Sequence, residues 1–131
     1  MPFPIEEKFI KETEDKLNVT FPFSYRNKML EQNGGELIIE DEDWQLIPFL
    51  DKSDKKRIAR TCNDIVKETN SGKESYGFPN NAIAIGQNGC GDYIVFLKSN
   101  ENNKLNNAVY IWSHEDGNAE EIAKDFSEIK E

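Results

Sequence analysis

The sequence contains few of the residues that build disulfide scaffolds, histidine-based active sites or membrane spans. Its 131 residues include two cysteines and one histidine. No unbroken apolar run is longer than five residues, as from Tyr93 to Leu97, whereas a membrane-spanning helix needs about 20. The N-terminus reaches Glu6 without an apolar segment, so nothing resembles a secretion signal. These absences predict a cytoplasmic protein without membrane association, in which Cys62 and Cys90 are buried free thiols.

Positive charge is the other scarce feature. The chain has 16 Lys and Arg against 25 Asp and Glu, a formal net charge of -9. This balance repels the phosphates of nucleic acids and favours basic partners, although a need for solubility also explains an acidic composition. We therefore expect a basic protein partner and no direct contact with nucleic acid. The local exception is the segment 52–60, which contains Lys52, Lys55, Lys56, Arg57 and Arg60 against Asp54.

Apolar residues at helical spacing predict four helices, at residues 5–17, 22–33, 54–70 and 118–129. Gly34 and Gly35 can take the positive φ that ends the second helix, and Ser71-Gly72 ends the third. Asn118 is a good N-cap for the fourth helix, with Glu121 three residues later. With 37% hydrophobic residues the chain can fill one core, so we expect a single domain spanning residues 1–131.

Five β-rich runs separate these helices. Residues 37–39 and 44–47 flank an acidic stretch and predict a hairpin, and residues 82–85, 93–97 and 109–112 predict three further strands. The connections between the last three lack a helical pattern, which favours an antiparallel meander. The sequence therefore predicts an α+β fold with an antiparallel or mixed sheet of about five to six strands, flanked by about four helices.

The residues that a catalytic site would need are sparse. Cys90 and Asp92 lie about twenty residues before His114, and a Cys-His-Asp arrangement is conceivable. Their spacing matches no local nucleophile signature, and a thiol beside β-rich segments is far more often a small buried hydrophobe. We predict no catalytic residues, and an enzyme would be supported only if these three side chains converge in one cleft.

Metal and cofactor sites are not indicated either. The acids at 40–43 lack the glycine and terminal glutamate of a calcium loop, and neither cysteine has a near partner for zinc. The glycine-rich stretch 86–91 lacks the lysine of a phosphate-binding loop and leads into a strand. We therefore expect no metal and no cofactor. Trp44 and Trp112 are expected in the core, with an exposed partner-binding role as the alternative.

Short motifs in a fixed order give the chain a family resemblance. They are Leu17, Phe21-Pro22, Tyr25, Leu30, Asn33-Gly34-Gly35, Trp44-Gln45-Leu46, Gly91-Asp92-Tyr93, the run from Val109 to Glu115, Ile122-Ala123 and Phe126. In this order they resemble the SUKH superfamily, the Smi/Knr-like domain, over nearly the whole chain. The resemblance implies an α+β domain that acts by binding. Many bacterial members are immunity proteins that neutralise toxins, often nucleases, and a similar fungal domain occurs in regulators of cell-wall synthesis.

The acidic composition and the resemblance together favour an immunity protein that blocks the active or substrate-binding cleft of a cognate toxin. A nuclease is basic in order to hold phosphates, so carboxylates compete for the same groups. The alternative is a regulatory or scaffold domain that binds a host protein. We expect a monomer or weak homodimer. The residues predicted to bind the partner are Glu40, Asp41, Glu42, Asp43, Trp44, Asp92, His114, Glu115 and Asp116, with the acidic segment from Glu115 to Glu131 as a second candidate patch.

Overall fold

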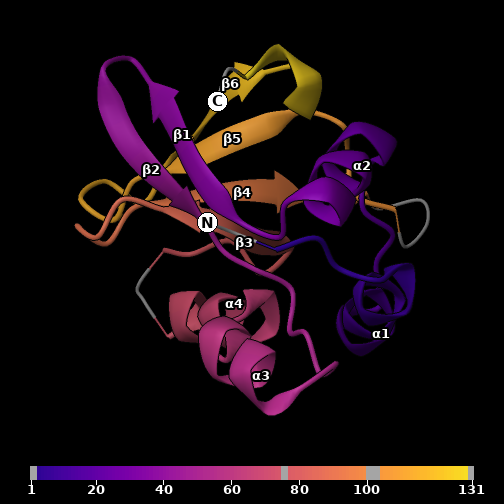
Figure 1. The fold of residues 1–131 in the computed structure, drawn as a ribbon. Helices are drawn as coiled ribbons and strands as arrows, with labels where there is room; N and C mark the ends of the chain where they lie inside the picture. The colour runs from indigo at the N-terminus through magenta and orange to yellow at the C-terminus, as the bar shows by residue number, and fades with distance from the viewer. Residues whose placement is uncertain (1–2, 75–76, 100–103, 130–131) are drawn as a thin grey trace.

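Six strands follow one another in chain order across one antiparallel sheet, in the part of the chain that the computed structural model describes, residues 3–74, 77–99 and 104–129. The strands are β1 (Gly35–Ile39), β2 (Glu42–Leu46), β3 (Ala82–Gln87), β4 (Tyr93–Leu97), β5 (Val109–Trp112) and β6 (Ala119–Ala123). The α+β class and the meander are confirmed, and every strand pair is antiparallel. Figure 1 shows the sheet curling from β1 round to β6.

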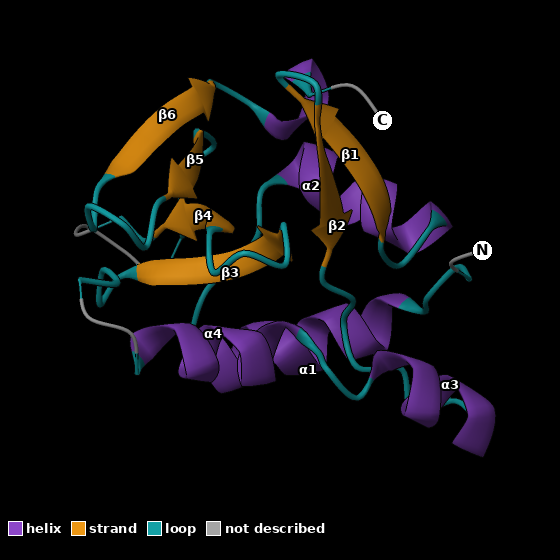
Figure 2. Cartoon of the chain, turned by 90° about the vertical axis from the view of Figure 1, so that its left-hand side faces the viewer, coloured by secondary structure: helices purple, strands orange, loops and turns teal. Residues whose placement is uncertain are grey.

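The first two predicted helices are present as α1 (Glu7–Leu17) and α2 (Phe23–Glu31). Leu17 is followed by Asn18, whose left-handed φ of 57° ends α1. The N-terminal segment is held beside α2, because the backbone N–H of Ile5 donates to the Leu30 carbonyl at 3.2 Å. Figure 2 shows α1 with the later helices α3 and α4 below β3.

The third predicted helix is in fact two helices, α3 (Lys55–Thr61) and α4 (Ile65–Lys73). Each begins at its own aspartate cap: Asp54 accepts from the Arg57 N–H at 2.8 Å and Asp64 from the Lys67 N–H at 2.9 Å. The apolar spacing continues across the break, so periodicity alone could not reveal the second cap and the change of direction there.

The predicted helix at 118–129 is wrong, because residues 119–123 form the edge strand β6. Trp112 of β5 pairs with Ala119, and Val109 pairs with Ala123. Asn118 caps no helix, and instead its N–H donates to Asp116 Oδ1 at 2.9 Å within the β5–β6 turn. Pairing with the neighbouring strand outweighs a local helical pattern here. Only Phe126–Glu128 form a short 3₁₀ helix, capped by Asp125.

Aromatic side chains fill the core on both faces of the sheet. Phe96 of β4 contacts Tyr25 of α2, with ring centroids 5.2 Å apart. Tyr93, an odd number of positions away and so on the opposite face, stacks on Trp112 at 6.2 Å. Trp44 and Trp112 are 2% and 0% exposed, which confirms them as core residues.

The two cysteines correct another prediction, because both are exposed free thiols. Cys62 follows α3 and Cys90 lies in the β3–β4 turn, and both positions are exposed. Among the described helices, none combines the length and the apolar character needed to cross a membrane.

Candidate functional site

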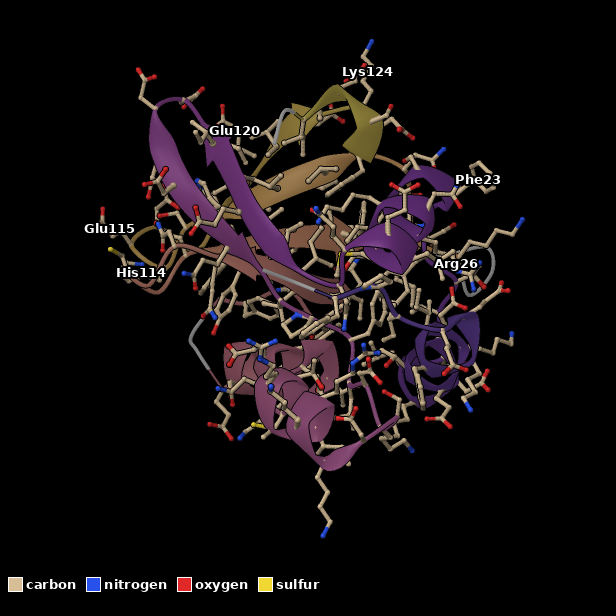
Figure 3. All side chains as sticks on the ribbon, in the orientation of Figure 1. Phe23, Arg26, His114, Glu115, Glu120 and Lys124 are labelled. Atoms are coloured by element: carbon tan, nitrogen blue, oxygen red, sulfur yellow. The ribbon has the colours of Figure 1, made fainter. Side chains whose placement is uncertain are left out.

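The meander brings three turns to one end of the sheet. Successive antiparallel strands reverse direction, so the β1–β2, β3–β4 and β5–β6 turns all lie at the same end. Figure 1 shows these turns on the left, and Figure 3 places His114 and Glu115 there, far from Phe23 and Arg26 of α2. Residues distant in the sequence therefore share one surface.

Hydrogen bonds tie these turns together through Asn88. Its side-chain nitrogen donates to Glu42 Oε1 at 2.8 Å and to Asp92 Oδ2 at 3.2 Å. Asp92 Oδ1 in turn accepts from the backbone N–H of His114 at 3.0 Å and lies 2.7 Å from His114 Nδ1. Glu42, Asp92 and His114, all predicted partner-binding residues, are thus held in one network.

Gly91 makes the close approach of His114 possible. It has a φ of 98°, and a Cβ atom there would lie 3.1 Å from His114 Nδ1. Both the backbone conformation and the space therefore favour glycine at this position. Partial burial raises the pKa of Asp92, but hydrogen bonds from His114 and Asn88 and the charge of His114 outweigh it, so the pKa is lowered from its ordinary value of 3.8.

Lysine and arginine are absent from the sequence segments that form this end. Residues 29–51, 74–97 and 105–123, which contain the three hairpins, have no lysine and no arginine. All 16 lysines and arginines lie outside these segments, although the hairpins are rich in carboxylates. We call the carboxylates that surround the three turns the acidic end: Glu36, Glu40, Asp41, Glu42, Asp43, Asp92, Glu115 and Asp116.

A polar pocket of about 420 Å³ opens within the acidic end. Gln45 of β2 pairs with Gln87 at the end of β3, so the β1–β2 hairpin continues past the end of β3. The hollow beside this extension has two carboxylates and one amide on the hairpin side and two amides on the other. Its lining residues are Glu36, Asp43, Gln45, Gln87, Asn88 and Gly89.

The two residues at the hairpin tip adopt a backbone conformation that is unfavourable for their residue types. Glu40 and Asp41 connect β1 to β2 with φ values of 50° and 66°. A two-residue turn with both φ values positive is normally Asn-Gly, since the left-handed conformation is energetically unfavourable for most other residues. Two carboxylates therefore stand at the tip at a cost to stability, a pattern that occurs at functional positions.

Trp44 does not belong to this surface, because it is 2% exposed and pairs with Leu37 beneath the hairpin. The exposed apolar side chain is Ile38, which is 57% exposed and lies opposite Asp43. The strand alternation could have shown this: Leu37 and Trp44 face one side of the hairpin, and Ile38 and Asp43 face the other. Ile38, and not Trp44, is therefore the exposed apolar side chain beside these carboxylates.

Cys90, Asp92 and His114 do not form a nucleophilic arrangement among the described residues. Asp92 and His114 contact each other on an exposed surface. No hydrogen bond joins Cys90 Sγ to His114 there, and the Cys90 backbone N–H donates to Asn88 Oδ1 at 2.9 Å. Within the same described ranges, no group of three or more His, Cys, Asp or Glu is arranged to hold a metal ion.

The segment from Glu115 to Glu131 is divided by the fold. Glu115 and Asp116 are exposed in the β5–β6 turn, whereas Glu120 and Glu121 lie on the edge strand β6. Asp125 contacts Ser24 of α2 at 2.8 Å, and residues 130–131 lie outside the described part. The second candidate patch is therefore not one surface, and only its first residues join the acidic end.

The structure first defines the class of protein, an α+β domain in which a six-stranded antiparallel meander packs against helices. Comparison with family models then gives the family: the SMI1 / KNR4 family (SUKH-1) matches residues 4–131. The chain belongs to this family, and the resemblance of its sequence motifs is confirmed. A comparison with curated proteins found no match.

Proposed function

We propose that the protein is an immunity protein that binds a cognate toxin through the acidic end and blocks the toxin's active or substrate-binding cleft. The observation that carries the proposal is the absence of lysine and arginine from three hairpins whose turns carry the carboxylates. The family supports a role in protein binding. In this proposal the protein acts by occupying the toxin's cleft and catalyses no reaction.

A basic partner fits this surface for electrostatic reasons. Carboxylates gathered at one end produce a local field stronger than the net charge alone would give, and this field speeds the encounter with a cationic cleft. A nuclease that holds phosphates with lysine and arginine presents such a cleft. The bound carboxylates would occupy the positions of the phosphates and exclude the substrate.

Charge sets the rate of encounter, and an apolar contact prolongs the complex. Ile38 supplies that contact, because its exposed side chain lies beside Asp43 and near the mouth of the polar pocket. The Asn88 network fixes the neighbouring turns before binding, which reduces the ordering cost of association.

Co-expression tests the proposal. A toxin encoded next to the gene of this protein is expressed with and without it, and growth and complex formation are measured. We expect a stable complex and restored growth. A complex with a host regulatory protein, together with no protection from any neighbouring toxin, would contradict immunity and favour the scaffold alternative.

A further inference from the structure

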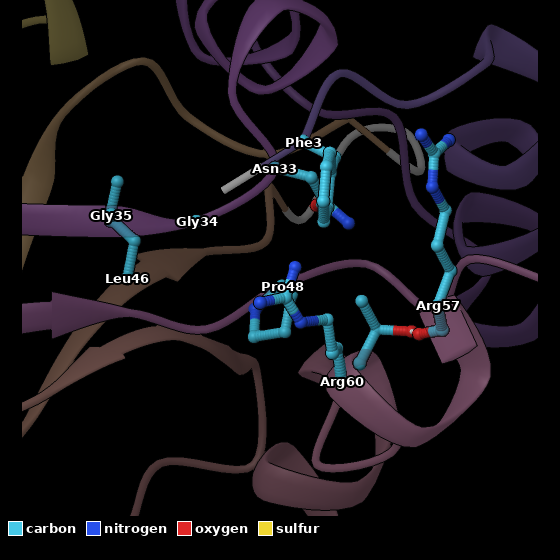
Figure 4. A pocket seen from close by; sticks show the side chains of 9 residues that line it. Phe3, Asn33, Gly34, Gly35, Leu46, Pro48, Arg57 and Arg60 are labelled. Carbon is cyan, nitrogen blue, oxygen red and sulfur yellow. Dashed lines mark hydrogen bonds between the residues drawn. The ribbon is translucent and has the colours of Figure 1, made fainter. Parts of the chain in front are cut away.

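A second pocket, of about 340 Å³, lies outside the acidic end, between α3 and the turn that joins α2 to β1. Figure 4 shows Phe3 on one side of its opening and Pro48 with Arg60 on the other. The volume falls in the range of small-molecule pockets. Its lining residues are Phe3, Asn33, Gly34, Gly35, Leu46, Pro48, Arg57, Arg60 and Thr61, none of them acidic.

Two arginines give this pocket a positive charge. Arg57 and Arg60 are three positions apart on α3 and so project from one helix face. The guanidinium carbon of each lies 4.8 Å from the centroid of the Phe3 ring. The ring is held in place by the backbone, because the Asn33 N–H donates to the Phe3 carbonyl at 2.9 Å. The cationic groups are therefore positioned before any ligand arrives.

The other polar side chains of the pocket already have partners. Asn33 exchanges two hydrogen bonds of 2.8 Å with the backbone of Phe49. Thr61 Oγ1 donates to the Arg57 carbonyl at 2.7 Å and accepts from the Asp51 N–H at 2.9 Å. The polar side chains left to meet a ligand are thus the guanidinium groups, which donate hydrogen bonds and carry positive charge.

The two arginines differ in how far they are neutralised. Arg57 lies 3.7 Å from the buried carboxylate of Asp51, whereas Arg60 forms no ion pair within the described residues. Phe3, Leu46 and Pro48 add apolar walls. A ligand that satisfies both features carries an oxyanion for the guanidinium groups and an apolar body for the walls.

We propose that this pocket binds a small organic anion, with its carboxylate or phosphate group on Arg57 and Arg60 and its apolar part against Phe3 and Pro48. The net charge of -9 repels extended polyanions, so a small monoanion or dianion suits the site. This site is independent of the acidic end and of toxin binding.

Phenyl phosphate is a suitable probe, with inorganic phosphate and phenol as its two halves. Titration of the ¹⁵N-labelled protein followed by NMR is expected to shift the amides of Gly34, Gly35 and Thr61, with phenyl phosphate binding about tenfold tighter than either half. Absence of saturable shifts, or shifts confined to other residues, would overturn the proposal.

Arg60→Gln and Lys56→Gln form a matched pair, since each removes one positive charge from an exposed position on α3. We expect Arg60→Gln to weaken phenyl phosphate binding about tenfold and Lys56→Gln to change it less than about twofold. Thermal unfolding of both variants checks that they fold. Equal weakening by the two substitutions would show general charge attraction and would overturn the site.

Discussion

His114 Nδ1 lies 2.7 Å from Asp92 Oδ1, and this contact joins the β5–β6 turn to the β3–β4 turn. Because Asn88 extends the same network to Glu42, three turns separated by more than twenty residues in the sequence behave as one surface. The network predicts how the stability of the fold depends on pH.

Asp92 should stabilise the protein only while it is ionised. Its pKa is lowered from 3.8 in the folded state, so the folded protein binds this proton more weakly than the unfolded chain does. The contribution is present above about pH 4 and is lost as the pH falls through the lowered pKa. Urea unfolding of the wild type and Asp92→Asn should therefore differ at pH 6, and the difference should shrink as the pH falls below 3.8. A difference that stays constant with pH would contradict this.

Replacing the hairpin tip should stabilise the fold. Asn-Gly in place of Glu40-Asp41 suits the two positive φ values, so the free energy of unfolding should rise by about 1 kcal/mol. Glu40→Gln with Asp41→Ala is the control, because it removes both charges without relieving the backbone. Chemical unfolding compares the two. An equal gain in both variants would assign the effect to charge.

The hydroxyl of Thr69 in α4 should stabilise the sheet where the register of β3 and β4 is irregular. Its Oγ1 accepts from the buried Ala84 N–H at 3.0 Å, beside the irregularity between Ala84 and Gly86. Thr69→Val leaves that N–H without a partner and should lower the free energy of unfolding by about 1–3 kcal/mol. Hydrogen exchange at Ala84 should accelerate in Thr69→Val but not in Thr69→Ser. Unchanged exchange in both variants would argue against the contact.

Replacement by phenylalanine should destabilise the protein at Tyr93 but not at Tyr25. The Tyr25 hydroxyl is buried without a hydrogen-bond partner in the described residues, and burial raises its pKa well above 10.0. Tyr25→Phe removes this hydroxyl and should leave the free energy of unfolding unchanged or raise it by up to about 1 kcal/mol. The pKa of Tyr93 is raised by burial and by its contact with Glu68, so Tyr93→Phe loses a hydrogen bond and should destabilise by about 1 kcal/mol. Thermal unfolding of both variants measures these changes in stability. An equal loss of stability in the two variants would contradict the expectation.

Most of the fold was accessible from the sequence because the strands are short, apolar and separated by turn residues. The run Tyr93–Leu97 and the hairpin around residues 40–43 were predicted correctly for that reason. The errors arose where local pattern and tertiary contact disagree. Residues 119–123 have helical spacing but pair with β5, and the Asp64 cap interrupts a periodicity that continues past it.

The candidate site was predictable in its residue types but not in its connections. Acidity identified Glu42, and a family motif contained Asp92, but their link through Asn88 depends on strand register. Ile38 could have been found from the alternation of β1, which places it on the exposed face. The distribution of lysine and arginine along the chain would have been a stronger indication of the acidic end than net charge.

The most direct test of the central claim compares two triple charge reversals in binding to the cognate toxin. Glu36→Lys, Asp43→Lys and Glu115→Lys alter the acidic end, and Glu6→Lys, Asp15→Lys and Glu31→Lys make the same change of net charge on exposed positions elsewhere. At low salt we expect the first set to slow association by about tenfold or more, an effect that shrinks at high salt, and the second set by less than about threefold. Equal slowing by both sets, or none by either, would contradict recognition through the acidic end.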